Sequence, residues 1–133
     1  MGRFAVNVLL DTHIWIWLAL GDERLSKRLR SILQRDNTEL WLSPISVWEA
    51  SMLCRKGRLK LEPSANKWIE TSIAKLSLKE ARLSFNVAMI ADKLDWSNKD
   101  PADRIIIATA LDSGFKLATE DVAIHEFGEV ELA

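Results

Sequence analysis

The chain has 133 residues, of which 48% are hydrophobic and 28% charged, and 18 basic and 19 acidic residues give a formal net charge of −1. This length and composition are typical of a single globular domain over residues 1–133, and they argue against a largely disordered chain. The near-zero charge excludes a global positive field, so a polyanion would have to bind through a local basic patch or a bound cation.

Short apolar segments alternate with longer segments of helical periodicity along the whole chain. The branched, apolar run before Asp11 is typical of a buried strand, and Ser43 before Pro44 is typical of a helix start. The expected elements are, in chain order, a strand over residues 5–10, helices over 12–20 and 23–34, a strand over 39–42, helices over 44–56 and 64–75, a strand over 81–83, helices over 84–94 and 102–113, and strands over 115–118 and 130–132. This alternation predicts an α/β fold, a doubly wound, mainly parallel sheet with helices on both faces.

Two features bear on the location of the protein. The apolar stretch over residues 4–20 contains Asp11 and His13, so we expect neither a transmembrane helix nor a signal peptide there. Cys54 is the one cysteine, which excludes an intrachain disulfide. A reducing, cytoplasmic setting without membrane contact is therefore the simplest expectation.

Acidic residues follow the expected strands or begin the expected helices. They are Asp11, Glu49, Asp100, Asp103, Glu120 and Asp121. In a parallel sheet these places meet at one edge, where ligands bind. Carboxylates held together repel one another unless a cation lies between them, and Mg²⁺ and Mn²⁺ take oxygen ligands and substrate phosphates. The pattern therefore predicts metal-dependent phosphoryl transfer or hydrolysis.

A structural role is the alternative for each acid taken singly. Carboxylates at helix starts cap the helix and stabilise its dipole, which is the favoured explanation for Glu120 and an equal one for Asp100 and Asp121. Asp11 closes a buried strand and Glu49 lies among apolar residues. These two carboxylates are harder to explain as structural, because a charge placed there must be compensated.

A set of short segments, kept in order over nearly the whole chain, carries a family pattern. The segments are residues 9–13 (LLDTH), 21–26 (GDERLS), 43–50 (SPISVWEA), 100–104 (DPADR), 107–111 (IATAL) and 117–121 (LATED). With them the chain resembles PIN-domain proteins, and among these the VapC-like ribonuclease toxins of toxin–antitoxin systems. Each segment is weak alone, and together they are fairly specific.

The resemblance implies a Mg²⁺- or Mn²⁺-dependent endoribonuclease, a phosphodiester hydrolase that acts on single-stranded or structured RNA. It implies that the catalytic and metal-binding residues are Asp11, Glu49, Asp103 and Asp121. It implies that the supporting residues are Thr12, Asp100 and Thr119. It also implies a homodimer, and inhibition by a small antitoxin of the VapB type whose tail occupies the groove.

Aromatic residues are numerous, with six tryptophans. Packing in the core or at a dimer contact is expected for four of them: Trp15, Trp17, Trp41 and Trp48. Trp96 lies in the polar loop before the DPADR segment, so it is the best candidate for contact with RNA or a partner.

Basic residues offer local positive patches. The run over residues 55–60 is equally consistent with RNA phosphate contacts and with a solvated helix end. Arg104 follows Asp103 and is expected to orient an acid or to bind phosphate. His13 lies two residues beyond Asp11, and a structural role is expected for it.

Two other functions are open at this point. A phosphatase or phospho-acceptor domain also ends its first strand with an aspartate, although such phosphatases usually carry a second aspartate where this chain has His13. A catalytically inert PIN-like binding module is the other alternative, which the presence of all four family acids disfavours. Replacement of Asp11 by Asn separates these functions, because it abolishes catalysis and leaves binding intact.

Overall fold

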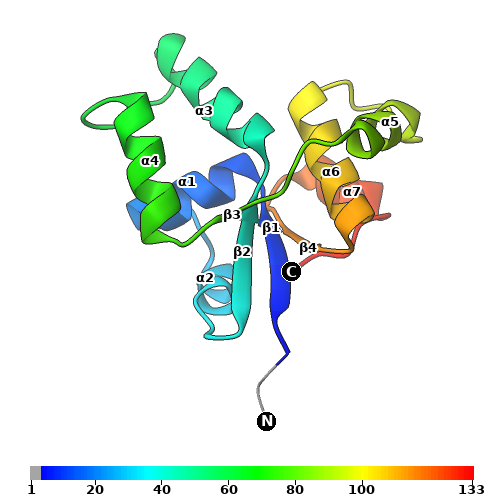
Figure 1. Ribbon diagram of the computed structural model, residues 1–133, viewed down its shortest axis with the longest axis horizontal. Coiled ribbons are helices and arrows are strands. Elements are labelled where there is room, and N and C mark those ends of the chain that lie inside the picture. Colours follow the sequence, from blue (N-terminus) through cyan, green and yellow to red (C-terminus); the bar gives the residue numbers. More distant parts are fainter. Residues whose placement is uncertain (1–3) are drawn as a thin grey trace.

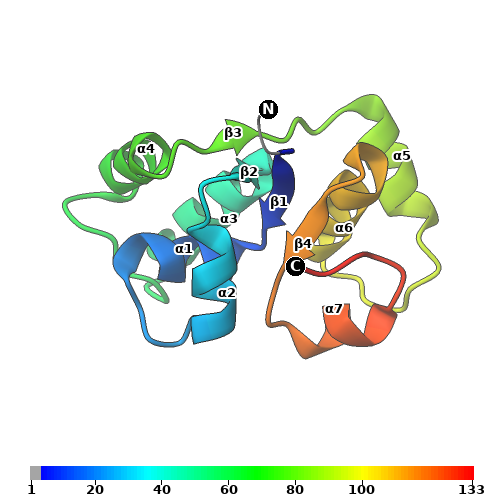
Figure 2. The same cartoon turned by 90° about the horizontal axis from the view of Figure 1, so that it is seen from below.

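A computed structural model describes residues 4–133. Within them lie seven helices and one parallel four-stranded sheet with the strand order β3-β2-β1-β4. The elements are β1 (Val6–Leu10), α1 (Thr12–Leu20), α2 (Lys27–Leu33), β2 (Thr38–Leu42), α3 (Pro44–Arg55), α4 (Ala65–Lys75), β3 (Lys79–Glu80), α5 (Phe85–Lys93), α6 (Pro101–Ser113), β4 (Lys116–Ala118) and α7 (Val122–Phe127). Helices α1 to α4 lie on one side of the strands and α5 to α7 on the other (Figures 1 and 2), which confirms the expected α/β fold.

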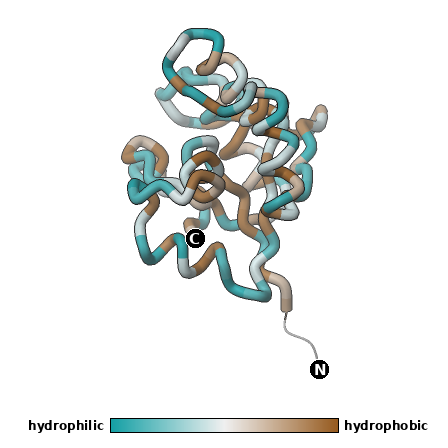
Figure 3. The backbone as a smooth tube through the Cα atoms, turned by 90° about the vertical axis from the view of Figure 1, so that its left-hand side faces the viewer, coloured by the Kyte–Doolittle hydropathy of each residue, from teal (hydrophilic) through white to brown (hydrophobic). Residues whose placement is uncertain are grey.

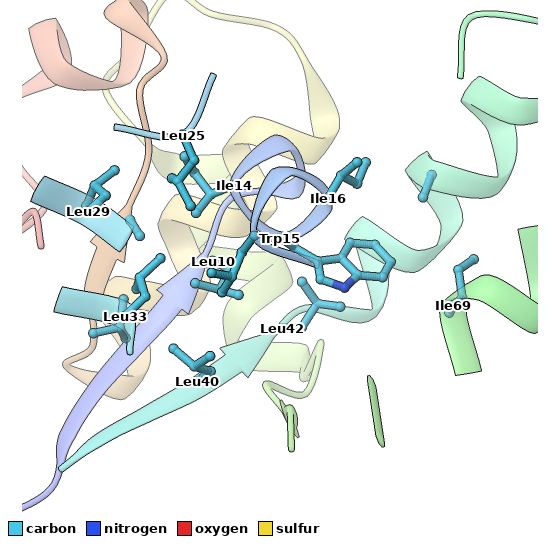
Figure 4. Close-up of a cluster of buried hydrophobic side chains, with 14 residues drawn as sticks. Leu10, Ile14, Trp15, Ile16, Leu25, Leu29, Leu33, Leu40, Leu42 and Ile69 are labelled. Atoms are coloured by element: carbon cyan, nitrogen blue, oxygen red, sulfur yellow. The ribbon is translucent and has the colours of Figure 1, made fainter. Parts of the chain in front are cut away.

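The larger core cluster packs the sheet against helices on the α1 side (Figure 4). Trp15 of α1 is completely buried in it, and its indole N–H donates a hydrogen bond to the Ser72 hydroxyl of α4 (3.1 Å). Burying a large apolar side chain contributes roughly 2–3 kcal/mol, and a buried indole N–H needs a partner of this kind. The cluster therefore anchors α1, the helix that Asp11 precedes, against the sheet.

The central strand β1 contributes to both faces of the sheet. Val8 and Leu10 belong to the larger cluster, whereas Leu9 packs in a second cluster with Ile106 of α6 and Ile124 of α7. Successive side chains of a strand point to opposite faces, so a strand covered on both faces is apolar at every position. This explains the unbroken apolar run that predicted β1.

Each helix begins at a serine or aspartate whose side chain accepts a backbone N–H of the first turn. These N-caps are Asp11, Ser26, Ser43, Ser64, Ser84, Asp100 and Asp121. Such caps satisfy donors that have no partner within the helix. Capping alone is therefore enough to explain why three aspartates lie at helix starts.

The second helix is shorter than predicted. It was expected over residues 23–34 and spans Lys27–Leu33, because the Ser26 hydroxyl caps it by accepting the Leu29 N–H (3.2 Å). The preceding residues form a turn in which the Asp22 carboxylate accepts the backbone N–H and the guanidinium of Arg24. Side-chain hydrogen bonds of this local kind compete with helix formation.

The edge strand β3 was predicted over residues 81–83 and lies at Lys79–Glu80. Both of its residues are exposed, and Lys79 pairs with Glu39 of β2 (2.8 Å). A polar, exposed edge strand has no apolar alternation, so its sequence carries no strand signal.

The C-terminal segment also differs from the prediction. The strand expected over residues 130–132 is a single parallel bridge between Leu132 and Leu117. Helix α7 was missed: Asp121 caps it by accepting the Ala123 N–H (2.8 Å), and Gly128 ends it with φ at 73°. An aspartate, a short apolar run and a closing glycine are its sequence signal, which is weak in a helix of six residues.

Apolar stretches gather in the interior of the molecule and polar ones in its loops (Figure 3). No helix within residues 4–133 is long and apolar enough to cross a membrane. Trp48 is not packed in the core, because 54% of its surface is exposed, and of the two expectations for it the dimer contact stays a prediction. It lies on α3 two residues from Ser46 and Ala50, which are both buried, and residues two apart on a helix face different directions.

Candidate active site

Four acidic residues follow or belong to elements at the carboxyl side of the sheet. Helices α3 and α6, which carry two of them, lie beyond that side of the strands (Figure 1). Asp11 follows β1, Glu49 lies in α3, Asp103 is in the first turn of α6 and Asp121 precedes α7. The charge of Asp121 raises the pKa of Asp11, that of Asp11 raises the pKa of Glu49, and those of Asp11 and Asp121 raise the pKa of Asp103, so these carboxylates lie close enough to interact electrostatically.

Asp11 is the most deeply placed of these acids, with 8% of its surface exposed. Its carboxylate accepts the Thr12 backbone N–H (2.8 Å) and the Thr119 hydroxyl (2.7 Å). Burial raises the pKa of the Asp11 carboxyl and Asp121 adds to this, whereas the two hydrogen bonds and His13 oppose it. Two donors therefore orient a carboxylate that burial makes costly to charge.

The Thr119 hydroxyl links two of the acids. It donates to Asp11 and accepts the backbone N–H of Asp121 (3.0 Å). The Thr119 carbonyl oxygen lies 2.9 Å from Nε2 of His125 in α7. One hydroxyl thus couples the ends of β1 and β4, the two neighbouring strands that carry Asp11 and Asp121.

Asp103 is half-buried and faces the most like charge. Burial raises its pKa to about 7, with further contributions from Asp100, Asp11 and Asp121. The side-chain amide of Asn98 donates to one of its oxygens (3.1 Å) and partly offsets the rise. The charge of this carboxylate is therefore poorly compensated by the protein alone.

Glu49 faces the same group of acids from α3. Burial raises its pKa, as do Asp100 and Asp11, whereas the Thr12 hydroxyl and His13 lower it. Thr12 also donates to the Ser46 hydroxyl (2.8 Å), which ties the start of α1 to the start of α3. His13 itself is exposed.

The remaining acids are placed differently from one another. Asp100 caps α6 by accepting the Asp103 backbone N–H (3.1 Å) and also raises the pKa of both Glu49 and Asp103. Glu120 is turned toward α2, where it accepts the Ser26 backbone N–H (3.2 Å). Asp100 thus combines capping with proximity to the site, and Glu120 makes a structural contact outside it.

The donor set fits a hard divalent cation better than zinc, because it consists of carboxylate oxygens. No three His, Cys, Asp or Glu side chains within residues 4–133 are arranged to hold an ion by themselves. Mg²⁺ is commonly held by one or two carboxylates, with waters and substrate phosphates completing its coordination. A cation held in this way among Asp11, Glu49, Asp103 and Asp121 would offset their repulsion.

Asn98 and Ser46 were not anticipated from the sequence. Asn98 belongs to a polar loop and also accepts the Asp100 N–H through its side-chain oxygen (2.9 Å), a local turn that asparagine favours. That turn propensity is the one sequence signal that could have identified Asn98. The Ser46 hydroxyl carried no comparable signal, because its partner Thr12 lies 34 residues away.

The structure bears on two further residues near the site. Arg104 makes no direct hydrogen bond to an acid, because its guanidinium donates to backbone carbonyl groups of the chain before α6. Trp96 is half-buried and packs against Phe127, with ring centroids 5.2 Å apart, and its contact with RNA or a partner stays a prediction.

This chain is similar to a family of known proteins. Residues 8–130 match the family model described as PIN domain. Ribonuclease VapC22 of Mycobacterium tuberculosis is 32% identical over 116 residues, which span 86% of this chain and 87% of that protein. The VapBC2 structure from Rickettsia felis, bound to a DNA fragment from their promoter, has a TM-score of 0.70 at 14% identity and covers 96% of this chain and 98% of its own. The FitAcB structure from Neisseria gonorrhoeae has a TM-score of 0.63 at 23% identity and covers 94% of this chain and 95% of its own.

Proposed function

The chain belongs to the PIN-domain family as a VapC-like ribonuclease toxin of a toxin–antitoxin system, and from this premise we propose that its acidic site hydrolyses RNA with the help of Mg²⁺ or Mn²⁺. We propose Asp11 and Asp103 as the principal ligands of the ion, and Glu49 and Asp121 as further ligands or as groups that orient the attacking water. Thr12, Asp100 and Thr119 support them.

The observation that carries this proposal is the convergence of carboxylates from four elements on one edge of the sheet. A phosphodiester carries negative charge and would be repelled by this edge in the absence of a cation. When bound, a divalent ion supplies charge neutralisation and lowers the pKa of a water molecule that it holds.

The residues of the chain supply orientation. The Thr12 N–H donates to one oxygen of Asp11 and the Thr119 hydroxyl to the other, so both oxygens of this carboxylate have a partner in the protein. Asn98 does the same for one oxygen of Asp103. Preorganised ligands of this kind avoid the cost of ordering them when substrate binds.

RNA cleavage by antitoxin-free protein tests the proposal, with Mg²⁺ or Mn²⁺ compared with EDTA. We expect Asp11→Asn to lower the rate by more than the roughly 100-fold that the loss of an outer-shell group typically costs. Glu120→Gln is the matched control, because it removes an acid that faces α2. Cleavage that survives in EDTA or in Asp11→Asn, with circular dichroism showing intact folds, would contradict the proposal.

We further propose a small antitoxin of the VapB type as a partner, supported by the solved VapBC2 and FitAcB relatives. Production of the toxin alone is expected to arrest growth, and co-production of its VapB-type antitoxin is expected to restore growth. Arrest that persists although both proteins accumulate would count against this partner.

A homodimer is proposed on the basis of exposed apolar residues on α5 and α6. Phe85 is 91% exposed, Met89 52% and Leu111 39%. Met89 and Leu111 border a hollow of about 660 Å³ with Phe127. We expect Phe85→Ser to shift the mass in light scattering from dimer to monomer, and Val122→Ser, at another exposed apolar residue, to leave it unchanged. An unchanged mass in Phe85→Ser would exclude this surface as the contact.

A cytoplasmic location is proposed on the ground that Cys54 is the one cysteine and is free. Fractionation of cells that carry a tagged protein tests this location, and recovery in an exported fraction would contradict it.

A further inference from the structure

Arg104 makes the densest set of side-chain hydrogen bonds next to the candidate site. Its guanidinium donates to the backbone oxygens of Ala91 (3.0 Å), Leu94 (2.9 Å), Trp96 (2.8 Å) and Asn98 (2.9 Å). Within residues 4–133 it forms no ion pair with a carboxylate. Four of its five N–H groups therefore donate to backbone oxygens, and its charge is not paired with the acids beside it.

The carbonyl groups that Arg104 binds lie at the end of α5 and in the segment that leads to α6. The last carbonyl groups of a helix have no partner within the helix, and this loop has few backbone hydrogen bonds of its own. A planar guanidinium with several fixed donors can satisfy such dispersed oxygens, whereas a lysine ammonium cannot reach them together. Arg104 thus substitutes for the missing backbone partners of residues 91–98.

The same loop carries Asn98, which is the direct link to the site. Arg104 binds the backbone oxygen of Asn98, and the side chain of Asn98 donates to Asp103 and accepts from the Asp100 N–H. Arg104 and Asp103 are neighbours in α6, so the loop is held at both ends by the same helical turn. The contacts form a closed circuit from Arg104 through Asn98 to Asp103.

We propose that Arg104 is a positioning residue, which holds the loop over residues 94–98 so that Asn98 orients the carboxylate of Asp103. The inference rests on the proposed function for its catalytic consequence. Its structural part, the ordering of the loop by Arg104, stands independently of that function.

The test uses Arg104→Lys, which keeps the positive charge and removes the branched donors, with Arg82→Lys as the matched control. Arg82 is exposed, and within residues 4–133 its side chain has no recorded hydrogen bond or ion pair. Amide hydrogen exchange is measured at Trp96 and Asp100, whose N–H groups have partners inside the loop. We expect exchange there to be at least about 10-fold faster in Arg104→Lys and unchanged in Arg82→Lys.

Steady-state cleavage gives the second measurement. We expect kcat to fall about 10- to 100-fold in Arg104→Lys with KM for RNA nearly unchanged, because Arg104 acts through Asn98 and does not contact substrate. Asn98→Ala should lower kcat similarly, and the double variant should be no worse than the more impaired single variant, as expected for two residues in one circuit.

Several results would overturn the inference. Unchanged loop exchange in Arg104→Lys would show that the guanidinium does not order the loop. A rise in KM with unchanged exchange would show that Arg104 binds phosphate, and additive losses in the double variant would show that Arg104 and Asn98 act separately. If Arg104→Lys does not fold, an unchanged kcat in Asn98→Ala overturns the inference alone. Absence of cleavage by the wild type would refute the proposed function, and the exchange result would still decide the role of Arg104.

Discussion

Asp11 and Asp103 lie at the same edge of the sheet but are held in different ways. Asp11 is almost fully buried and receives hydrogen bonds from the Thr12 N–H and the Thr119 hydroxyl. Asp103 is half-buried, and its carboxylate receives one from the amide of Asn98. The first position is set by the end of a strand, and the second by a loop and the first turn of a helix.

The two carboxylates differ in how firmly the backbone holds them and in how much free energy it costs to charge them. The Asp11 N–H continues the strand ladder by donating to the Ala118 oxygen (3.0 Å), so its backbone has little freedom. Asp103 has a less constrained environment and the pKa that is raised to about 7, chiefly by burial and then by Asp100. We infer that the strand side provides a fixed ligand and the helix side an adjustable one, which a cation would complete.

Cation binding gives the largest expected effect on this comparison. At 100 times its Kd, a ligand of the folded state stabilises it by about 2.7 kcal/mol, which is about 10 °C in Tm for a chain of this size. We expect Mg²⁺ or Mn²⁺ to raise Tm at pH 8, EDTA to reverse the rise, and both Asp11→Asn and Asp103→Asn to reduce it strongly. A rise that only one of the two substitutions reduces would show that the ion does not lie between them.

The Thr119 hydroxyl offers a smaller test of the fixed side. Thr119→Val keeps the shape of the side chain and removes the donor to Asp11 and the acceptor for the Asp121 N–H. We expect cation affinity, measured by calorimetry, to fall about 10- to 100-fold, whereas Thr119→Ser should retain most of it. Equal losses in the two variants would mean that packing of the methyl group, and not the hydroxyl, matters there.

The smallest effect concerns the pH dependence of the cation-free protein. Because the folded-state pKa of Asp103 is about 7 and its ordinary value is 3.8, the folded state binds more protons between these limits. Stability is therefore lost as pH rises from about 4 to 7, and Asp103→Asn should reduce this loss, to which the raised pKa values of Asp11 and Glu49 also contribute. Solvent screens the charge of this half-exposed carboxylate. We therefore expect Asp103→Asn to raise the free energy of unfolding at pH 8 by about 1 kcal/mol, or Tm by about 4 °C.

Thermal unfolding in EDTA at pH 4.5 and pH 8 measures this effect. Asp92→Asn is the control, because Asp92 is exposed on α5 and absent from the charges that act on Asp103. A gain in Asp103→Asn of the same size at both pH values would mean that the carboxylate is not selectively destabilising when charged.

Local patterns account for the elements that were predicted well. The helix expected over residues 12–20 has those bounds, and Gly21 ends it with φ at 67°, a conformation that favours glycine. The helix expected from 102 to 113 begins one residue earlier, at Pro101. The misplaced β3 and the missed α7 are short or polar elements, which depend on their neighbours for stability.

The residues of the candidate site also differ in how well the sequence predicts them. Sequence pattern and family resemblance led to Asp11, Glu49, Asp103 and Asp121, because acids at strand ends and helix starts are visible in the order of residues. Neither pattern nor resemblance could assign Asn98 to Asp103, because that contact depends on the path of an irregular loop.

The sequence by itself therefore determined the alternation of strands and helices, the edge at which the acids gather and the family to which they belong. These properties follow from periodicity and from residue types within a few positions of one another. Only the tertiary structure decided that Thr119 orients Asp11 across 108 residues, that Arg104 donates to the backbone of a loop, and that Trp48 faces solvent. Such contacts join groups whose distance is set by the packing of whole elements, a quantity that local sequence does not contain.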